Sequence, residues 1–190
     1  MKKRCPWGFK EQGMLEYHDV EWGTPLHDDK RLFELLVLEG FQAGLSWSTV
    51  LRKRQAFRDA FDDFNPQKIS EYTNMDIDRL VKNPLIIRNK LKISAAIENA
   101  RHFIEVQKEF DSFDKYIWRF VNNKPIINHF NSFSEMQPET RESRLMSENM
   151  RMRGFRFVGP TICYAFMQAA GLVNDHIVDC FRWKEVQCLK

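Results

Sequence analysis

The sequence predicts an all-α fold built from many short helices. Apolar residues recur with helical spacing along most of the chain, and capping residues precede several of these segments. No run alternates between apolar and polar residues as a half-buried strand would. Because 43% of the 190 residues are hydrophobic and 13% are aromatic, the chain can fill one packed core, and we expect a single domain over residues 1–190.

Each predicted helix is justified by a cap, an apolar face, or both. Asp28 and Ser46 are suitable N-caps, and Asn65 followed by proline is a typical helix start. The helix after Ser46 is expected to direct Phe57 inward and Arg54 outward. In chain order the predicted helices cover residues 14–21, 28–44, 46–61, 65–71, 74–81, 88–107, 112–121, 138–153 and 160–170. The remaining long segment, residues 122–137, is predicted to be a loop.

Charge and cysteine content restrict the class of protein. The formal net charge is +3, which is compatible with nucleic-acid binding but does not by itself argue for it. The four cysteines are unevenly spaced, unlike the framework of a secreted disulfide-rich protein. The N-terminus has no apolar signal segment, and no apolar run is long enough to span a bilayer. We therefore expect a cytoplasmic protein that does not bind membranes.

Two pairs of metal-ligand residues stand at opposite ends of the chain. Cys5 and His18 lie near the start, and His176 and Cys180 lie near the finish. Thiolate and imidazole are ligands that zinc prefers, and a closed set of two cysteines and two histidines is typical of a structural ion. The spacing of His176 and Cys180 is that of one helical face. A shared ion would hold both ends of the chain together.

The segment between the last two predicted helices is a candidate anion-binding hairpin. It is bounded by Gly154 and Gly159 and carries Arg151, Arg153 and Arg156. A glycine lets backbone N–H groups approach an anion, and the following helix N-terminus adds partial positive charge. Phosphate contacts of this kind position a protein on DNA without reading its sequence. A tight helix–helix connection with solvated arginines explains the same residues equally well.

The residues from Leu38 to Trp47 form a second unusual segment. Glu39 follows a run of apolar residues, where a charge is costly unless it is paired or functional. Together with Tyr17 and Trp22, these residues are candidates for a pocket that binds a flat or cationic ring. A glutamate at a helix end with aromatic residues in the core is the simpler explanation, because most aromatic side chains serve packing.

Five motifs, in this order, resemble the 3-methyladenine DNA glycosylase I family over essentially the full chain. They are Cys5-Pro-Trp7, the segment from Tyr17 to Gly23, the segment from Leu38 to Trp47, the segment from Arg153 to Gly159, and the segment from Val173 to His176. A chance match of five ordered motifs is implausible. In the wider superfamily an aspartate often stands two residues before the histidine that follows the hairpin, whereas this chain has Asn174 there. The 3-methyladenine branch shares that absence, and we expect Asp175 to point elsewhere.

The resemblance implies a helix-hairpin-helix glycosylase that removes 3-methyladenine from alkylated double-stranded DNA without cutting the strand. The released base is free 3-methyladenine, the expected cofactor is one structural zinc ion, and the expected state is a monomer. Glu39 is the implied catalytic residue. The implied base contacts are Tyr17, Trp47, Trp22 and Trp7, and the implied zinc ligands are Cys5, His18, His176 and Cys180. The DNA contacts are expected from Gly154, Arg156, Val158, Gly159 and a wedge at Leu45.

Three other functions stay open at the level of the sequence. A DNA-binding module that uses only the hairpin would release no base. A zinc hydrolase would need an open coordination position, which four protein ligands do not leave. A protein with a purely structural, partner-binding role would use the region from Glu39 to Trp47 as ordinary core.

Overall fold

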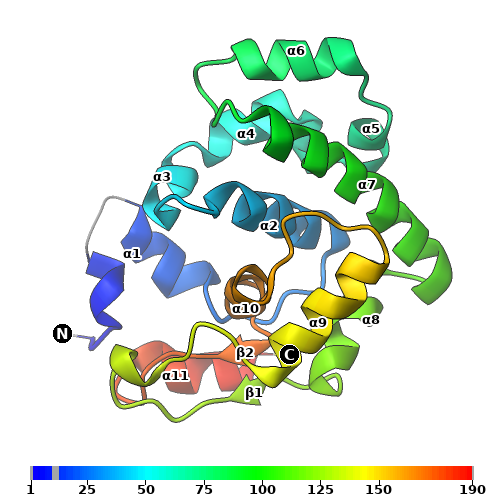
Figure 1. The fold of residues 1–190 in the computed structure, drawn as a ribbon. Coiled ribbons are helices and arrows are strands. Elements are labelled where there is room, and N and C mark those ends of the chain that lie inside the picture. The colour runs from blue at the N-terminus through cyan, green and yellow to red at the C-terminus, as the bar shows by residue number, and fades with distance from the viewer. Residues whose placement is uncertain (1, 10–12, 190) are drawn as a thin grey trace.

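The computed structural model describes residues 2–9 and 13–189, and this part of the chain is mainly helical (Figure 1). The N-terminal half contains the 3-10 helix η1 (Pro6–Phe9), α1 (Met14–Glu16), the π-helix η2 (Tyr17–Glu21), α2 (Asp29–Gln42), α3 (Trp47–Arg52), α4 (Arg54–Ala60), η3 (Asp62–Phe64), α5 (Pro66–Ser70) and α6 (Asn74–Lys82). The C-terminal half contains α7 (Lys90–Phe110), α8 (Phe113–Trp118), η4 (Arg119–Val121), η5 (Phe133–Glu135), α9 (Arg141–Met152), α10 (Pro160–Ala169), α11 (Phe181–Glu185) and η6 (Val186–Cys188). The all-α prediction is confirmed.

The predicted capping residues begin the helices assigned to them. The Asp28 carboxylate accepts a hydrogen bond from the Arg31 N–H at 2.8 Å, at the start of α2. Ser46 and Asn65 cap α3 and α5 in the same way. These caps satisfy N–H groups that have no partner inside the helix, which is why their sequence signal is strong.

The helix predicted after Ser46 is divided at Lys53 into α3 and α4. The expectation that Arg54 points outward is wrong. Its guanidinium is buried and donates to Glu34 at 2.7 Å and to Glu21 at 2.7 and 2.8 Å. An arginine can be buried when its donors are paired with carboxylates, and this pairing ties η2, α2 and α4 together. Local spacing cannot reveal a partner 33 residues away.

Helix α2 lies in the middle of the molecule, with α4 and α7 on one side and α10 on the other (Figure 1). Most of its side chains are buried, including the continuous run from Leu32 to Glu39. A helix that is apolar nearly all round is expected at the centre of a helical protein. The aromatic richness of the chain is used here, because Phe41 packs against Phe57 and Phe61 with ring centroids 4.7 and 6.0 Å apart.

The absence of strands predicted from the sequence is wrong in one place. β1 (Ile126–Ile127) pairs in parallel with β2 (Val173–Asn174), inside the segment expected to be loop and just after α10. Two residues are too few to show an alternating pattern, so the sequence carries no strand signal there. The pairing brings the segment after η4 next to the C-terminal segment that contains His176.

The two ends of the described chain lie together. The Phe181 N–H donates to the Lys3 carbonyl at 2.9 Å. Within the described residues, no helix is long and apolar enough to cross a membrane. Buried side chains from both ends of the chain extend this contact toward the candidate functional site.

Candidate functional site

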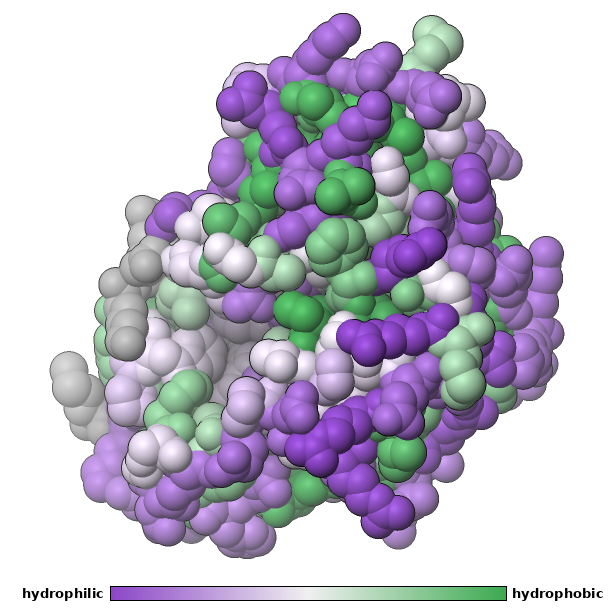
Figure 2. Space-filling view, viewed as in Figure 1, coloured by the Kyte–Doolittle hydropathy of each residue, from purple (hydrophilic) through white to green (hydrophobic). Residues whose placement is uncertain are grey.

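A cavity of about 300 Å³ lies between the N-terminal segment, the end of α2 and α10. Its volume is at the lower end of the range of small-molecule sites, about 300–1,000 Å³. Figure 2 shows a hollowed region of the surface between the N-terminal segment and the centre of this face. The five residues that the sequence suggests for base binding and catalysis all line it: Trp7, Tyr17, Trp22, Glu39 and Trp47.

Among the residues that the structure describes, Glu39 is the only acidic one that lines the cavity. It lies in the last turn of α2 with 3% of its surface exposed. Removal from water disfavours the charged carboxylate and raises the pKa of Glu39 to about 8. Its Oε2 is buried and has no hydrogen-bond partner. Glu39 in the folded protein is therefore a largely protonated carboxyl at neutral pH, with an unused hydrogen-bonding position.

Two further buried polar atoms in this cavity also lack partners. They are the indole N–H groups of Trp7 and Trp47. Among the described residues only one other side-chain atom is in this state, Nε of Arg182. A buried polar group without a partner costs about 1–3 kcal/mol. Three such groups around one cavity indicate that they serve a ligand rather than the fold.

The aromatic rings line the cavity as a tilted set rather than a flat stack. The Tyr17 and Trp47 centroids are 5.3 Å apart at 49°, and Trp7 meets Trp22 edge-on at 4.9 Å and 80°. Burial, followed by the nearby Glu39 and Glu21 charges, raises the pKa of Tyr17 well above its usual value. Its hydroxyl therefore stays protonated and can donate a hydrogen bond. The arrangement suits a flat ring with polar edges.

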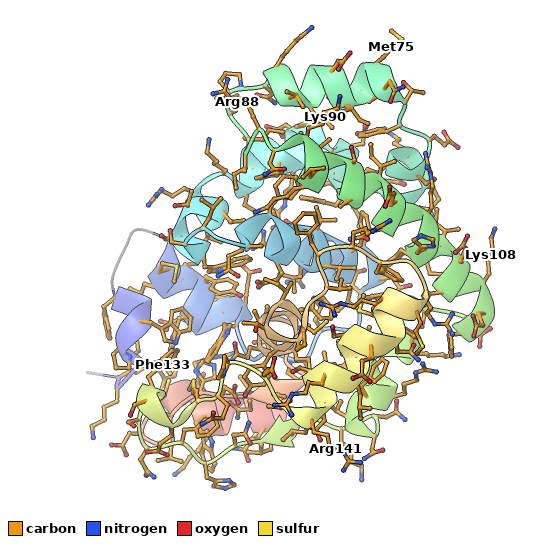
Figure 3. The ribbon with its side chains drawn as sticks, in the orientation of Figure 1. Met75, Arg88, Lys90, Lys108, Phe133 and Arg141 are labelled. Atoms are coloured by element: carbon orange, nitrogen blue, oxygen red, sulfur yellow. The ribbon has the colours of Figure 1, made fainter. Side chains whose placement is uncertain are left out.

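Five further residues line the cavity but were not predicted from the sequence as site residues: Met14, Gln42, Phe133, Ala165 and Gln168. Gln42 lies within the segment that the sequence analysis marked as unusual, so its position was a usable signal. Phe133 comes from the segment predicted as loop and is partly exposed at the edge of the cavity (Figure 3). Ala165 and Gln168 lie one turn apart on α10. Nothing in the local sequence around these last three residues indicates a shared cavity.

The four predicted metal ligands converge next to this cavity. Cys5, His18, His176 and Cys180 are all buried, and their ligand atoms lie within 4.8 Å of one another. Cys180 Sγ is 3.5 Å from both His18 Nε2 and His176 Nδ1, and Cys5 Sγ is 3.5 Å from His176 Nδ1. Nitrogen and sulfur ligands at zinc bond lengths stand about 3.5 Å apart in a tetrahedron. The four side chains therefore fit one tetrahedral zinc ion.

The second nitrogen of each histidine is also held. His18 Nδ1 lies 2.8 Å from Asp19, and His176 Nε2 lies 3.0 Å from the Trp22 carbonyl. Burial opposes the charge of Asp19, but hydrogen bonds from Arg4 and His18 outweigh it and lower the pKa of Asp19. Such partners fix the ring orientation of metal-binding histidines. Hydrogen bonds from the Cys5 thiol and both histidines also lower the pKa of Cys180, which favours the thiolate that a metal needs.

The helical spacing predicted for His176 and Cys180 is wrong, although the two ligand atoms do meet. Residues 175–180 form an irregular turn, and Cys180 is the N-cap of α11, a helix that the sequence analysis did not predict. The turn is held by a hydrogen bond from the Cys180 N–H to the Ile177 carbonyl at 2.8 Å. A spacing of four residues therefore brought the ligands together through a turn instead of a helix.

The hairpin between α9 and α10 has the conformation that its glycines allow. Gly154 has φ +92°, and a Cβ there would stand 2.5 Å from Nε2 of His102. The Asn99 side chain bonds both the N–H and the carbonyl of Arg156, so this N–H is not free for an anion. The N–H groups of Val158 and Gly159 donate to no group in the described part of the chain. These two groups are the candidates for phosphate contacts.

The other predicted DNA contacts differ in exposure. The Arg156 guanidinium is exposed and pairs with Glu98, whereas the Val158 side chain is buried, which leaves only the Val158 backbone for a DNA contact. Leu45 is exposed beyond the end of α2. The buried Lys92 ammonium donates to the carbonyls of Phe41 and Ala43 and supports this helix end. Leu45 thus stands on a supported turn, as a wedge requires.

Asn174 and Asp175 are both buried. Asn174 donates to the Trp183 carbonyl and accepts from the His176 N–H, so it stabilises the turn that carries the metal ligands. The expectation that Asp175 points elsewhere holds, because its carboxylate accepts hydrogen bonds from Asn128, Tyr164 and Gln168.

Comparison with known proteins gives one consistent family. A sequence profile described as "Methyladenine glycosylase" matches residues 7–183. A DNA-3-methyladenine glycosylase from Haemophilus influenzae is 45% identical over 180 residues, which cover 95% of this chain and 97% of the relative. A crystal structure of 3-methyladenine DNA glycosylase I superimposes with a TM-score of 0.92 at 43% identity, covering 99% of this chain and all of that one. A Tyr-to-Phe variant of such an enzyme, solved in complex with 3-methyladenine, superimposes with a TM-score of 0.91 at 38% identity, covering 94% and 96% of the two chains.

Proposed function

The chain belongs to the methyladenine glycosylase family, and from this premise we propose that it hydrolyses the N-glycosidic bond of 3-methyladenine in alkylated DNA. It releases the free base and leaves an abasic site, without cutting the strand. The observation that carries the proposal is the group of three unpartnered polar atoms, from Trp7, Glu39 and Trp47, around one aromatic cavity. A methylated purine offers both a flat ring and polar edge atoms to such a cavity.

The reaction starts with a base that is already a good leaving group. Methylation at N3 makes the adenine cationic, so the bond to C1′ is weakened and the base departs neutral. The base must leave the stack to reach the cavity, because no enzyme can reach it inside the duplex. Trp47 stacks on the ring, and Tyr17 donates a hydrogen bond to its edge. Trp7 and Trp22 close the sides of the cavity. Water then adds to C1′ as the base departs.

Glu39 selects the methylated base through charge. Burial holds the pKa of Glu39 at about 8, and a cationic base close by favours the carboxylate and lowers that pKa. The ion pair forms in a cavity with little water, where electrostatic interactions are stronger than in solvent. An unmodified adenine brings no charge and leaves Glu39 protonated. Glu39 therefore selects the cationic base on binding, and its catalytic role is to stabilise the positive charge that moves to the sugar as the base departs neutral.

One structural zinc ion belongs to the same proposal. The fit of Cys5, His18, His176 and Cys180 to a tetrahedron supports it, and so do the partners that hold both histidines. When bound, the ion supplies cross-linking of the two ends of the chain and no chemistry on the base. Four protein ligands leave no open position, which argues against a zinc hydrolase. The sequence neighbour of His18 is Tyr17, so the cluster also positions one wall of the cavity.

The DNA partner is placed by the hairpin and the turn at Leu45. The free N–H groups of Val158 and Gly159 at the start of α10, together with Gly154 and Arg156, suit a backbone phosphate of double-stranded DNA. In this proposal the segment between α9 and α10 acts as a helix-hairpin-helix motif, and Leu45 fills the space left by the extruded base. A monomer offers one such site. A cytoplasmic location is consistent with four free cysteines in the described chain.

Release of free 3-methyladenine from methylated duplex DNA tests the proposal. The wild type should release the base under single-turnover conditions, and Glu39→Gln should be slower by about 10²–10³-fold, as for loss of a stabilising group at a charged transition state. Trp47→Ala should weaken the binding of free 3-methyladenine by about tenfold or more, as expected for loss of a stacking platform.

The control is Glu71→Gln, which removes an exposed carboxylate at the end of α5, away from the cavity and the hairpin. It should release the base at the wild-type rate. If zinc-loaded, folded wild type releases no 3-methyladenine, the proposal fails. If it binds duplex DNA but releases nothing, a DNA-binding module is the better description.

A further inference from the structure

A second carboxylate, Asp175, lies behind the wall of the cavity and is completely buried. It accepts hydrogen bonds from Asn128 Nδ2 at 2.6 Å, from the Tyr164 hydroxyl at 2.6 Å and from Gln168 Nε2 at 2.7 Å. The three donors come from the segment after β1 and from two successive turns of α10. In all three bonds the carboxylate is the acceptor, so this network has a defined direction.

Of these three donors, only Gln168 also lines the cavity. Its backbone carbonyl accepts from the Gly23 N–H at 2.9 Å, which fixes this part of α10 against the segment carrying Trp22. The side-chain amide has two ends, a donor and an acceptor. Because its Nε2 donates to a carboxylate oxygen of Asp175, the amide cannot rotate by half a turn without losing that bond. No group in the described chain donates to its Oε1.

The held amide therefore offers the cavity a hydrogen-bond acceptor. The position that distinguishes adenine from guanine and hypoxanthine is the sixth ring carbon, which carries an amino group in adenine and an oxygen in the other two. An amino group donates and an oxo group only accepts. An acceptor facing an oxo group leaves two acceptors in contact without a proton between them, which is unfavourable in a buried site.

We propose that Gln168, oriented by Asp175, is a specificity-determining residue that accepts a hydrogen bond from the 6-amino group of the extruded base and disfavours 6-oxo purines. This inference rests on the proposed function and adds the choice between methylated purines to it. Glu39 recognises the charge of the base, and Gln168 recognises the identity of the purine. Asp175 is a positioning residue that acts through Gln168 and does not touch the base.

Binding of two free bases, one with an amino group and one with an oxo group at the sixth ring position, tests the inference, and the Gln168 variant separates this group from the ring N–H that accompanies the oxo form. We would titrate 3-methyladenine and 3-methylhypoxanthine into zinc-loaded protein and follow the fluorescence of the cavity tryptophans. The wild type should prefer 3-methyladenine by about 10- to 100-fold, the range expected for one buried hydrogen bond gained against one mismatched. Gln168→Met, of similar size, should reduce the preference to within about threefold, because no amide acceptor is left.

Asp175→Asn tests the positioning role. An asparagine both donates and accepts, so either end of the Gln168 amide can face it, and the preference should fall as in Gln168→Met. Tyr164→Phe is the matched control, because it removes another donor from the same carboxylate oxygen and leaves Gln168 in place. It should lower thermal stability and keep the wild-type preference. Zinc content and thermal unfolding are measured for each variant.

The outcomes separate the inference from the proposed function. An unchanged preference in Gln168→Met overturns the inference, even where the wild type releases 3-methyladenine from DNA normally. A lost preference in Gln168→Met with a retained one in Asp175→Asn overturns the role of Asp175 only. Should Asp175→Asn fail to fold, Asn128→Ala replaces it as a test of the network, because it removes the donor to the other oxygen of Asp175. This variant should keep the wild-type preference for 3-methyladenine. Loss of that preference would overturn the proposed direction of the network. A wild type that releases no base from methylated DNA sinks the proposed function itself.

Discussion

The metal cluster and the base cavity are neighbours that bury polar groups in opposite ways. In the cluster, each of the four ligand atoms has another within hydrogen-bond distance, and both histidines have a second partner. In the cavity, Glu39, Trp7 and Trp47 each bury a polar atom with no partner. The two regions share a wall, because Trp22 packs edge-on against His176 with ring centroids 4.7 Å apart. The four groups of the cluster are arranged so that they could hold one ion, whereas the unpartnered groups of the cavity are available to a ligand with polar edges.

This difference separates the buried polar groups that stabilise the fold from those that are available to bind a ligand. Buried polar groups that satisfy one another stabilise the folded chain, and those left unsatisfied reduce its stability. The cavity therefore costs stability that the rest of the fold must supply, as functional sites often do. Removing one polar group should consequently have opposite effects in the two regions.

The largest effect is expected in the cluster. Cys180→Ser removes one of four ligands, so the protein should lose its zinc and about 5 kcal/mol of stability, which corresponds to roughly 10–20 °C in Tm for a chain of this length. Metal analysis of the purified protein and thermal unfolding measure both. The control is Cys188→Ser, because Cys188 is exposed and has no place in the cluster. Stoichiometric zinc retained by Cys180→Ser would contradict the ligand set.

A second effect, of opposite sign, is expected at Glu39. Its pKa in the folded protein is about 8, against an ordinary value of 4.5, so the folded state holds the proton over a pH range in which the unfolded state has lost it. Stability is therefore lowered as pH rises from about 4.5 to about 8, by about 1.4 kcal/mol per pH unit. Glu39→Gln has no such proton, so it should match the wild type near pH 4.5 and exceed it by a few kcal/mol above pH 8.

Urea unfolding of both proteins across pH 4–9 gives this difference, in which titrations common to the two chains cancel. A difference that stays constant with pH would mean that Glu39 is not desolvated in the folded protein. The cavity would then lack the property on which its selectivity for a cation depends.

The smallest effect on stability is expected for Tyr17→Phe. No group in the described chain bonds the Tyr17 hydroxyl, so its loss should change stability by less than about 0.5 kcal/mol. Binding of free 3-methyladenine should nevertheless weaken by about tenfold, because the hydroxyl donates to the base. Calorimetric titration and thermal unfolding distinguish the two quantities. A large loss of stability without a loss of binding would place this hydroxyl in the fold instead of the cavity.

The fold was predictable from sequence wherever a local cause acts. Asp28, Ser46 and Asn65 begin helices because their side chains accept hydrogen bonds from N–H groups three residues further along the chain. β1 and β2 were not predictable, because each is two residues long and is held by a partner about 50 residues distant. Arg54 was misplaced for the same reason, since its burial depends on carboxylates in η2 and α2.

What the sequence by itself determined is the chemistry of the two regions. Cysteine and histidine side chains can bind a metal in any fold, and a glutamate within an apolar helix is costly in any fold. Only the tertiary structure decided which atoms meet: that His176 and Cys180 converge through a turn, that Phe133 and Gln168 share a cavity with Trp47, and that Asp175 holds the amide of Gln168. The physical reason is that residue type sets what a group can bind, whereas long-range packing sets the direction in which it points.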